Sequence, residues 1–311
     1  MKEIHWLALI STGSAMLLSS CNSNQTLNQS SSASSVPPQP ISYQTHTLAN
    51  TVIHTVTIPN YSTTFLQSPV VTTALERELA TIEDFAKKHQ AIVAINGGFF
   101  DPKNQKTTSY IVKDGELIAD PSENERLIDN PNLEPYMDKI LNRSEFRRYS
   151  CRDSLKGYYS PNYASYDIVP HTEPIPNNCQ LVDALGAGPA ILPEDTSFEE
   201  GFVDYANGEV IRDALGSNRM NARSAVGITT EGTIIFAMAA QKPEQPRNSG
   251  INLPDFAAFL KTLGVEKAMN LDGGSSASLY YQGTTIYGRV DGEGNAIQRP
   301  IKSVLIVQPS N

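Results

Sequence analysis

The chain has no excess of basic residues and no long apolar run outside its N-terminus. It carries 24 lysines and arginines against 33 aspartates and glutamates, for a net charge of −9. A protein that grips nucleic acid through its phosphates needs a clustered basic surface, so this acidic balance argues against that class. No run beyond the N-terminus approaches the roughly 20 apolar residues of a membrane-spanning helix, which excludes a polytopic membrane protein.

Several common catalytic signatures are also missing. The five histidines show no pair at zinc-ligand spacing: His5, His46, His54, His89 and His171. No nucleophile elbow accompanies a Ser-His-Asp set, and no Gly-Lys-Ser/Thr of a Walker loop follows a glycine-rich turn. We therefore expect no cofactor and no metal, while an oxygen-ligated Mg²⁺ or Ca²⁺ near Asp272 and Asn270 is left open.

The first 20 residues are typical of an export signal. Residues 6–18 are mostly apolar, which suits a signal peptide and is too short for a comfortable span. The run Leu18-Ser-Ser-Cys21 resembles a bacterial lipobox, which implies cleavage before Cys21 and attachment of acyl chains such as palmitate. Each buried methylene contributes about 0.8 kcal/mol, so two or more chains hold a protein on a membrane. We expect an exported lipoprotein anchored in the cell envelope; an ordinary cleaved signal is the alternative.

Residues 21–44 are predicted to be a disordered tether. They are rich in serine, asparagine and glutamine, followed by Pro37-Pro-Gln-Pro40. Such a segment has too little apolar area to offset its ordering entropy. Hydrophobic residues make up 40% of the chain, enough for a sizeable core, and we place a single catalytic domain at 45–311.

Two cysteines, Cys151 and Cys179, lie within this domain. Outside the cytoplasm such a pair is usually a disulfide, and closing the intervening loop would stabilise the fold by roughly 3–4 kcal/mol in the chain-entropy model. A free catalytic thiol is the alternative, but no histidine lies in a recognisable partner position. Both lie in a region at 121–180 that is rich in tyrosine and arginine: Tyr149, Tyr158, Tyr159, Tyr163, Tyr166, Arg143, Arg147, Arg148 and Arg152. This region is either an insertion that covers the core and helps to determine substrate specificity, or a surface loop that contacts no ligand.

Short strands outnumber helices in the predicted secondary structure. Strands are expected at residues 51–58, 91–95, 110–113, 116–119, 224–229, 233–239, 266–271, 279–282 and 301–307. Asp114-Gly115 is a strong hairpin turn, and Glu231-Gly232 resembles it. The pattern indicates an α+β fold with a mixed, largely antiparallel sheet and a few packed helices.

Two helices are expected. Thr73-x-x-Glu76 fits a capping box, and an apolar stripe follows it at Leu75, Leu79, Ile82 and Ala86. The second helix has Pro254 in its first turn, an apolar stripe, and a glycine to close it; the residues are Phe256, Phe259, Leu260, Leu263 and Gly264.

Three glycine-punctuated turns each follow an apolar strand: Asn96–Phe100, Gly186–Pro189 and Asn270–Ser276. Glycine lets backbone N–H groups approach a ligand closely, and a nest of such donors suits phosphate oxygens. Ser275 and Ser276 add hydroxyl donors. Any one of these is more often a simple tight turn, but three of them, two with an Asn or Asp beside the glycines, favour a functional site.

Two arginines are candidate phosphate ligands. Arg223 begins an apolar strand, where its guanidinium could grip a phosphate bidentately. A strand-end surface arginine is an equal alternative. Arg299, before Pro300, is a weaker version of the same case.

Together with Gly250–Ala257, these motifs resemble the phosphodiester glycosidase family. The match runs in order over residues 90–307, interrupted by the tyrosine-rich region. Ser275 stands where the family has a third glycine after the aspartate, and Gly186-Ala-Gly-Pro189 replaces its Gly-Gly-Pro turn. The resemblance implies cleavage between a sugar's anomeric carbon and a phosphodiester oxygen.

This reaction sets the expected roles. Phosphate is already a weakly basic leaving group, so it needs less acid assistance than the two-carboxyl glycosidases provide. One carboxylate, a cation and N–H donors could suffice. Asp272 is our choice for the carboxylate; Asp255 is a second candidate, although a first-turn aspartate also favours the helix dipole.

The other candidate residues would contact substrate. Arg223, Ser275 and Ser276 are assigned to the phosphate, and Asn96 and Asn270 to sugar hydroxyls or the attacking water. The remaining expected binding residues are Gly97, Gly98, Phe99, Gly188, Gly273, Gly274 and Arg299. The only tryptophan, Trp6, lies in the predicted signal, so Phe99, Phe100 or the tyrosine-rich region must supply any sugar-stacking face.

The expected substrate is an α-linked, N-acetylglucosamine-like sugar 1-phosphodiester of envelope or extracellular polysaccharide. Two alternatives remain open. One is a non-catalytic lipoprotein that binds sugar phosphates or polysaccharide. The other is a metal-dependent phosphodiesterase that cuts the P–O bond.

Overall fold

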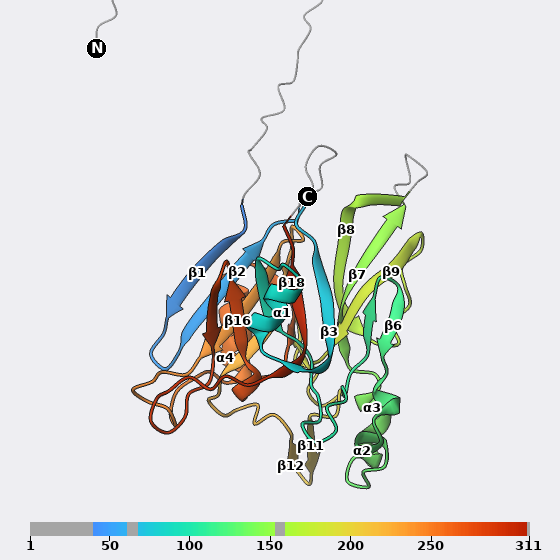
Figure 1. Ribbon diagram of the computed structural model, residues 1–311. Helices are drawn as coiled ribbons and strands as arrows, with labels where there is room; N and C mark the ends of the chain where they lie inside the picture. The colour runs from blue at the N-terminus through green and yellow to red at the C-terminus, as the bar shows by residue number, and fades with distance from the viewer. Residues whose placement is uncertain (1–39, 61–67, 153–158, 310–311) are drawn as a thin grey trace, which may run out of the picture. The chain divides into compact units, whose positions relative to one another are not determined.

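The computed structural model in Figure 1 describes residues 40–60, 68–152 and 159–309, and side chains within 159–163 are left out of the description. The predicted signal, Cys21, Trp6, Tyr158 and nearly all of the tether lie outside the described residues. Tyr159 and Tyr163 are placed by their backbone alone. A strand already begins at Ser42, three residues before the predicted domain boundary at 45.

Three antiparallel sheets and one hairpin make up the described fold. The first sheet has the order β1 (Ser42–Thr47), β2 (Val52–Ile58), β14 (Ile234–Ala240), β13 (Arg223–Thr229), β15 (Val265–Asn270) and β10 (Ala190–Leu192). The second has the order β17 (Thr284–Tyr287), β16 (Ser278–Tyr281), β4 (Val93–Asn96), β18 (Ile301–Val307) and β3 (Val71–Ala80). The third has the order β6 (Glu116–Ala119), β5 (Ile111–Lys113), β9 (Cys179–Gly186), β7 (Ser144–Arg152) and β8 (Tyr159–Pro170). The hairpin pairs β11 (Val203–Ala206) with β12 (Glu209–Asp213).

The helices are few and short, which confirms the predicted α+β class with a largely antiparallel arrangement. The α-helices are α1 (Ile82–Lys88), α2 (Glu125–Ile128), α3 (Met137–Ile140) and α4 (Leu253–Thr262). Three short 3-10 turns accompany them: η1 (Pro121–Glu123), η2 (Glu134–Tyr136) and η3 (Gly274–Ser276). Within the described ranges no helix is long and apolar enough to cross a membrane.

The main core lies between the first two sheets. Val226 and Met238 of the first sheet pack there with Ile95 and Leu305 of the second, all fully buried. Helix α4 covers the other face of the first sheet through Phe256 and Leu260. Helix α1 covers the other face of the second sheet, as Figure 1 shows in teal in front of β18. The two sheets are therefore held as a sandwich whose strand ends carry the turns predicted to form the site.

The first helix begins later than the capping pattern at Thr73 predicts. Residues 71–80 form strand β3, which pairs with β18 from Val71↔Val307 to Ala80↔Ile301. The capping box that does form is Thr81 with Asp84, each side chain accepting from the other residue's backbone N–H. Strand β3 includes Leu75 and Leu79, two of the apolar residues that also fit a helical stripe, so the prediction of a helix from Thr73 was wrong.

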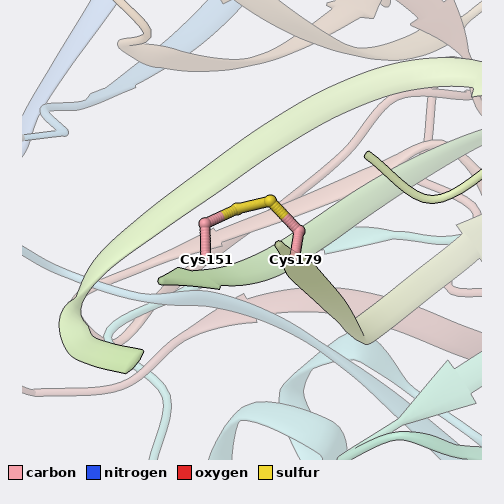
Figure 2. Close-up of a disulfide and its surroundings, with 2 residues drawn as sticks. All are labelled: Cys151 and Cys179. Carbon is pink, nitrogen blue, oxygen red and sulfur yellow. A yellow bond between two sulfur atoms is a disulfide. The ribbon is translucent and has the colours of Figure 1, made fainter. Parts of the chain in front are cut away.

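The tyrosine-rich region is built into the third sheet rather than looped out from it. Strand β7 pairs with β9 on one side and with β8 on the other. Phe146, Ile168 and Leu185 extend the main core into this sheet. Cys151 and Cys179 are cross-strand partners in β7 and β9 and form a disulfide with a Cα–Cα distance of 4.0 Å (Figure 2). The predicted disulfide is thus confirmed.

Candidate active site

The three glycine-rich turns lie against one another at the ends of β4, β9 and β15. The backbone N–H of Asp272 donates to the carbonyl of Gly97 at 3.0 Å. The N–H of Gly188 donates to the carbonyl of Asn270 at 3.1 Å, and the Asn270 amide returns a bond to the Gly188 carbonyl at 3.0 Å. Segments more than 80 residues apart in sequence thus form one continuous surface around Asp272.

The glycines of the first two turns allow the chain to approach itself. A Cβ on Gly98 would lie 2.1 Å from the Gly186 carbonyl oxygen, and one on Gly97 would lie 2.4 Å from Ser303 Oγ. At Gly188, where φ is +101°, a Cβ would lie 2.0 Å from Glu200 Oε2. Contacts this short exclude a side chain. These glycines let three strand ends meet, and their contact with a ligand stays a prediction.

Asp272 is the carboxylate at this junction. Its side chain keeps some solvent-exposed surface, although the surrounding protein desolvates the carboxylate. This burial raises the pKa of Asp272 to about 6, against opposing contributions from Ser276, Arg299 and the Gly273 N–H. That N–H donates to Oδ1 at 2.9 Å. The Ser276 hydroxyl is close enough to lower the pKa of Asp272 but has no partner at hydrogen-bond geometry. A carboxyl group with a pKa near 6 is suited to proton transfer close to neutral pH.

Arg299 is the cation beside this carboxylate. Its Nη1 donates to Ser275 Oγ at 2.9 Å, and its guanidinium carbon lies 5.2 Å from the ring centre of Phe100. Its charge acts on Asp272 and lowers the pKa of that group. The sequence named Arg299 only as the weaker arginine, but the structure places it, and Ser275, next to Asp272.

Arg223 has a different surrounding from the one predicted. Only 2% of this residue is exposed. Its guanidinium donates to four backbone carbonyls, those of Leu215, Gly216, Arg219 and Ile251. Burial lowers the pKa of Arg223 to about 10, which leaves it charged at neutral pH. These bonds fix the 215–219 segment, and the Arg223 side chain also lies beside the Gly273 turn, where a Cβ on Gly273 would be 3.8 Å from Arg223 Cδ. The phosphate contact of Arg223 stays a prediction.

The two asparagines hold backbone in place. Asn96 is fully buried; its Nδ2 donates to the Asp272 carbonyl at 2.5 Å, and its Oδ1 accepts from the Ser278 N–H at 3.1 Å. It therefore positions the Asp272 turn, and its contact with sugar or water stays a prediction. Asn270 is 1% exposed, and its Oδ1 is buried without a hydrogen-bond partner. Among the described residues no three carboxylate, imidazole or thiol groups gather as a metal site.

The structure does not bring Asp255 into this cluster. It lies in the first turn of α4, where its N–H donates to Asn252 Oδ1 at 2.7 Å and its Oδ2 accepts from Asn252 Nδ2 at 2.9 Å. The residue is exposed and acts in helix capping, the role weighed against catalysis at the sequence level.

Sequence reasoning missed the group that holds the Gly188 turn. Glu200 is buried, and its carboxylate accepts from the Ser144 hydroxyl at 2.6 Å, the Ala190 N–H at 2.9 Å and the Thr196 hydroxyl at 2.5 Å. No motif marks a carboxylate whose partners are this scattered in sequence, so nothing short of the fold reveals it.

An aromatic and basic stack was also missed at this edge. The rings of Phe99 and Phe202 lie 5.6 Å apart, and the Arg143 guanidinium lies 3.7 Å above Phe202. Burial lowers the pKa of Arg143 to about 10. Phe99 was predicted from its turn and Arg143 was noted only as part of a basic cluster. Phe99 and Arg143 both contact Phe202, and this contact requires segments that are distant in sequence to pack beside the Asn96–Phe100 turn.

Known proteins resemble the chain over most of this region. A family model described as phosphodiester glycosidase matches residues 89–308. The Mus musculus N-acetylglucosamine-1-phosphodiester alpha-N-acetylglucosaminidase is 26% identical over 213 residues, which are 67% of this chain and 35% of the mouse protein. The Homo sapiens enzyme of the same name is 26% identical over 208 residues, with the same shares. The chain thus spans about a third of the length of these relatives.

Solved structures share the fold at lower identity. The catalytic domain of the zebrafish enzyme of that name, described as auto-inhibited by its pro-peptide, has a TM-score of 0.57 and 19% identity, covering 89% of this chain and 85% of that one. A Burkholderia pseudomallei protein assumed to be exported has a TM-score of 0.54 and 16% identity, covering 83% and 74%. At these identities the likeness establishes the fold alone.

Proposed function

The chain belongs to the phosphodiester glycosidase family, and we propose that it hydrolyses an α-linked, N-acetylglucosamine-like sugar 1-phosphodiester, releasing the sugar and a phosphomonoester. The observation that carries this proposal is Asp272, a desolvated carboxylate with a pKa of about 6, placed beside the Arg299–Ser275 pair. The sugar class is taken from the names of the mammalian relatives.

In the proposed reaction, Asp272 acts on the attacking water, and Arg299 with Ser275 acts on the leaving phosphate. A water oxygen bonds to the anomeric carbon while the bond from that carbon to the phosphodiester oxygen breaks. The electron pair leaves with the phosphate, and ionised Asp272 takes the proton from the water. Arg299 and the Ser275 hydroxyl would stabilise the charge that develops on the leaving oxygen. No second carboxyl group is required, because a phosphate leaves without strong acid assistance.

Positioning supports this division. Asn96 fixes the Asp272 backbone, and Glu200 fixes the neighbouring Gly188 turn. Because this carboxylate is already held in place, it loses little conformational entropy when substrate binds. Phe99 and Phe100 are the aromatic side chains we propose for the apolar face of the sugar.

The test is a panel of α-sugar 1-phosphodiesters offered to the full chain and to Asp272→Asn. We expect turnover of at least one member, a loss of about 10³-fold or more in kcat in the variant, and binding within a few-fold of the original. The matched control is Asp255→Asn, which changes an exposed helix-capping carboxylate. Full activity of Asp272→Asn would overturn the proposal. Binding by the unaltered chain without turnover of any panel member would favour the non-catalytic alternative.

We further propose that the protein acts on envelope or extracellular polysaccharide as a lipoprotein, with a signal at 1–20, an acylated Cys21 and a tether to about residue 44. An exported assignment of one structural relative agrees with this placement. Labelled palmitate should enter the chain expressed in a bacterium and should be absent from Cys21→Ala. Equal label in both would contradict the anchor while leaving the activity unaffected.

A further inference from the structure

A cavity adjoins the turn that carries Asp272. It has a volume of about 620 Å³, and three arginines line it: Arg219, Arg247 and Arg289. The chain carries a net charge of −9, so a concentration of guanidinium groups around one hollow is unusual for its surface. None of the motifs predicted from the sequence includes these three residues.

The cavity and the candidate active site share a wall. A Cβ on Gly274 would lie 3.4 Å from Arg289 Nη1 and 3.6 Å from Asn221 Nδ2, and both of these residues line the cavity. Gly274 is two residues from Asp272, and the next residue, Ser275, accepts from Arg299. Arg289 and Arg299 thus both lie beside this short turn.

The acidic residues of the cavity are already engaged within the protein. Asp291 accepts from the N–H groups of Glu293 and Asn295, each at 2.9 Å, and this lowers the pKa of Asp291. Asp213 accepts from the Ser217 N–H at 2.9 Å and lies near the charge of buried Arg223.

The arginines are not engaged in this way. Within the described part of the chain, the side chains of Arg219, Arg247 and Arg289 make no salt bridge and no hydrogen bond. All three residues are exposed and line the cavity, so within the described residues their guanidinium donors stay available to a ligand there. Guanidinium forks match the oxygens of a phosphate bidentately.

We infer that this cavity binds a second phosphate of the substrate, so that the preferred substrate is an oligomer or polymer of repeating sugar phosphodiesters and not a single diester. The inference rests on the proposed function, since it places the scissile phosphate at Arg299 and Ser275. The next phosphate along the chain then lies across the Gly274 turn, among the three arginines.

The test compares substrates with one and two phosphates. The probes are a methyl phosphodiester of N-acetylglucosamine 1-phosphate and a synthetic dimer with two consecutive sugar phosphodiesters. The variant is Arg219→Gln with Arg247→Gln, both exposed residues without protein partners, which leaves Arg289 at the turn unchanged. The control removes two positive charges elsewhere, with Arg77→Gln on β3 and Lys87→Gln on α1.

We expect kcat/KM on the dimer to fall about 10- to 100-fold in the double variant, with less than a twofold change on the methyl diester. The control should keep the original preference. Equal kcat/KM values on the two substrates in the unaltered protein, or equal losses on both in the double variant, would overturn the inference while the proposed function stands.

Binding separates the two ideas when turnover is absent. In the Asp272→Asn background, calorimetry should show the dimer binding at least tenfold more tightly than the methyl diester, with the difference lost on adding the two arginine substitutions. If the unaltered chain hydrolyses neither probe but this difference is found, the proposed function fails and the second phosphate site remains. If there is no difference, the site fails.

Discussion

The side-chain amide of Asn96 donates a hydrogen bond to the main-chain carbonyl of Asp272 at 2.5 Å, across 176 residues of sequence. The same amide accepts from the N–H of Ser278, so one buried side chain ties β4 to both ends of the 272–276 turn. The candidate carboxylate therefore depends for its place on a strand that is distant in sequence but pairs with β16 in the same sheet. This dependence makes Asn96 testable as a positioning residue.

Asn96→Ala should lower kcat more than it raises KM. Loss of the amide frees the Asp272 turn and leaves buried polar groups unsatisfied, at a cost of about 1–3 kcal/mol in unfolding free energy. We expect kcat to fall about 10- to 100-fold, with KM changed less than threefold. Asn295→Ala, in an exposed loop, is the control. A proportionate rise in KM with an unchanged kcat would assign Asn96 to substrate binding instead.

The rate should depend on pH through Asp272. Because the proposed role needs the ionised carboxylate, kcat should be low on the acid side and rise with pH around about 6, the pKa that burial gives this group. The profile of kcat against pH checks this. A rate that falls with rising pH through the same range would mean that Asp272 acts as an acid.

Stability should show the opposite trend for the same residue. The pKa of Asp272 is raised from 3.8 to about 6 on folding, so the folded state holds this proton more tightly than the unfolded state. This contribution is fully present below about pH 4 and is lost as pH rises to about 6. Above pH 6 the free energy of unfolding of Asp272→Asn should therefore exceed that of the original by about 1–3 kcal/mol. Near pH 4 the two values should be equal. A variant less stable than the original at pH 7 would contradict this.

Substitution of Arg299 should lower the reaction rate, whereas substitution of Arg223 should lower the stability of the fold. Arg299→Met removes the cation beside the leaving group, so kcat/KM should fall about 10²- to 10³-fold with little change in stability. It should also move the acid limb of the pH profile upward, because Arg299 lowers the pKa of Asp272.

Arg223→Met should instead destabilise the fold by at least about 3 kcal/mol, because it leaves four loop carbonyls without their donor. Unfolding by denaturant and steady-state rates, measured on both variants, distinguish these outcomes. A stable Arg223→Met protein with a rate loss equal to that of Arg299→Met would support the predicted phosphate contact of Arg223 and contradict a purely structural role.

The sequence was informative where local pattern decides structure. Asp114-Gly115 forms its hairpin with both residues at positive φ, and Pro254 lies in the first turn of α4 as predicted. The pattern was ambiguous at 71–80, where apolar residues fit a helix and a strand equally. There, pairing with β18 decided the outcome, and such pairing is not visible in a local window.

For the site, motifs located the turns but could not orient the side chains. Arg223 and Arg299 look alike in sequence, and only the fold shows that the first donates to loop carbonyls and the second to Ser275. Glu200 carries no local signal because its partners come from distant segments. The three arginines of the cavity carry none because separate segments of the chain bring them together. Burial could not be read for Asp272 either, so its raised pKa emerged only from the packed structure.

The measurement that tests the central claim most directly is hydrolysis of a sugar 1-phosphodiester in ¹⁸O-labelled water, with both products analysed by mass. Attack at the anomeric carbon puts the label on the released sugar and leaves the phosphomonoester unlabelled, which is the result we predict. Label on the phosphate would mean that the P–O bond breaks, and Asp272 would then not face an anomeric centre.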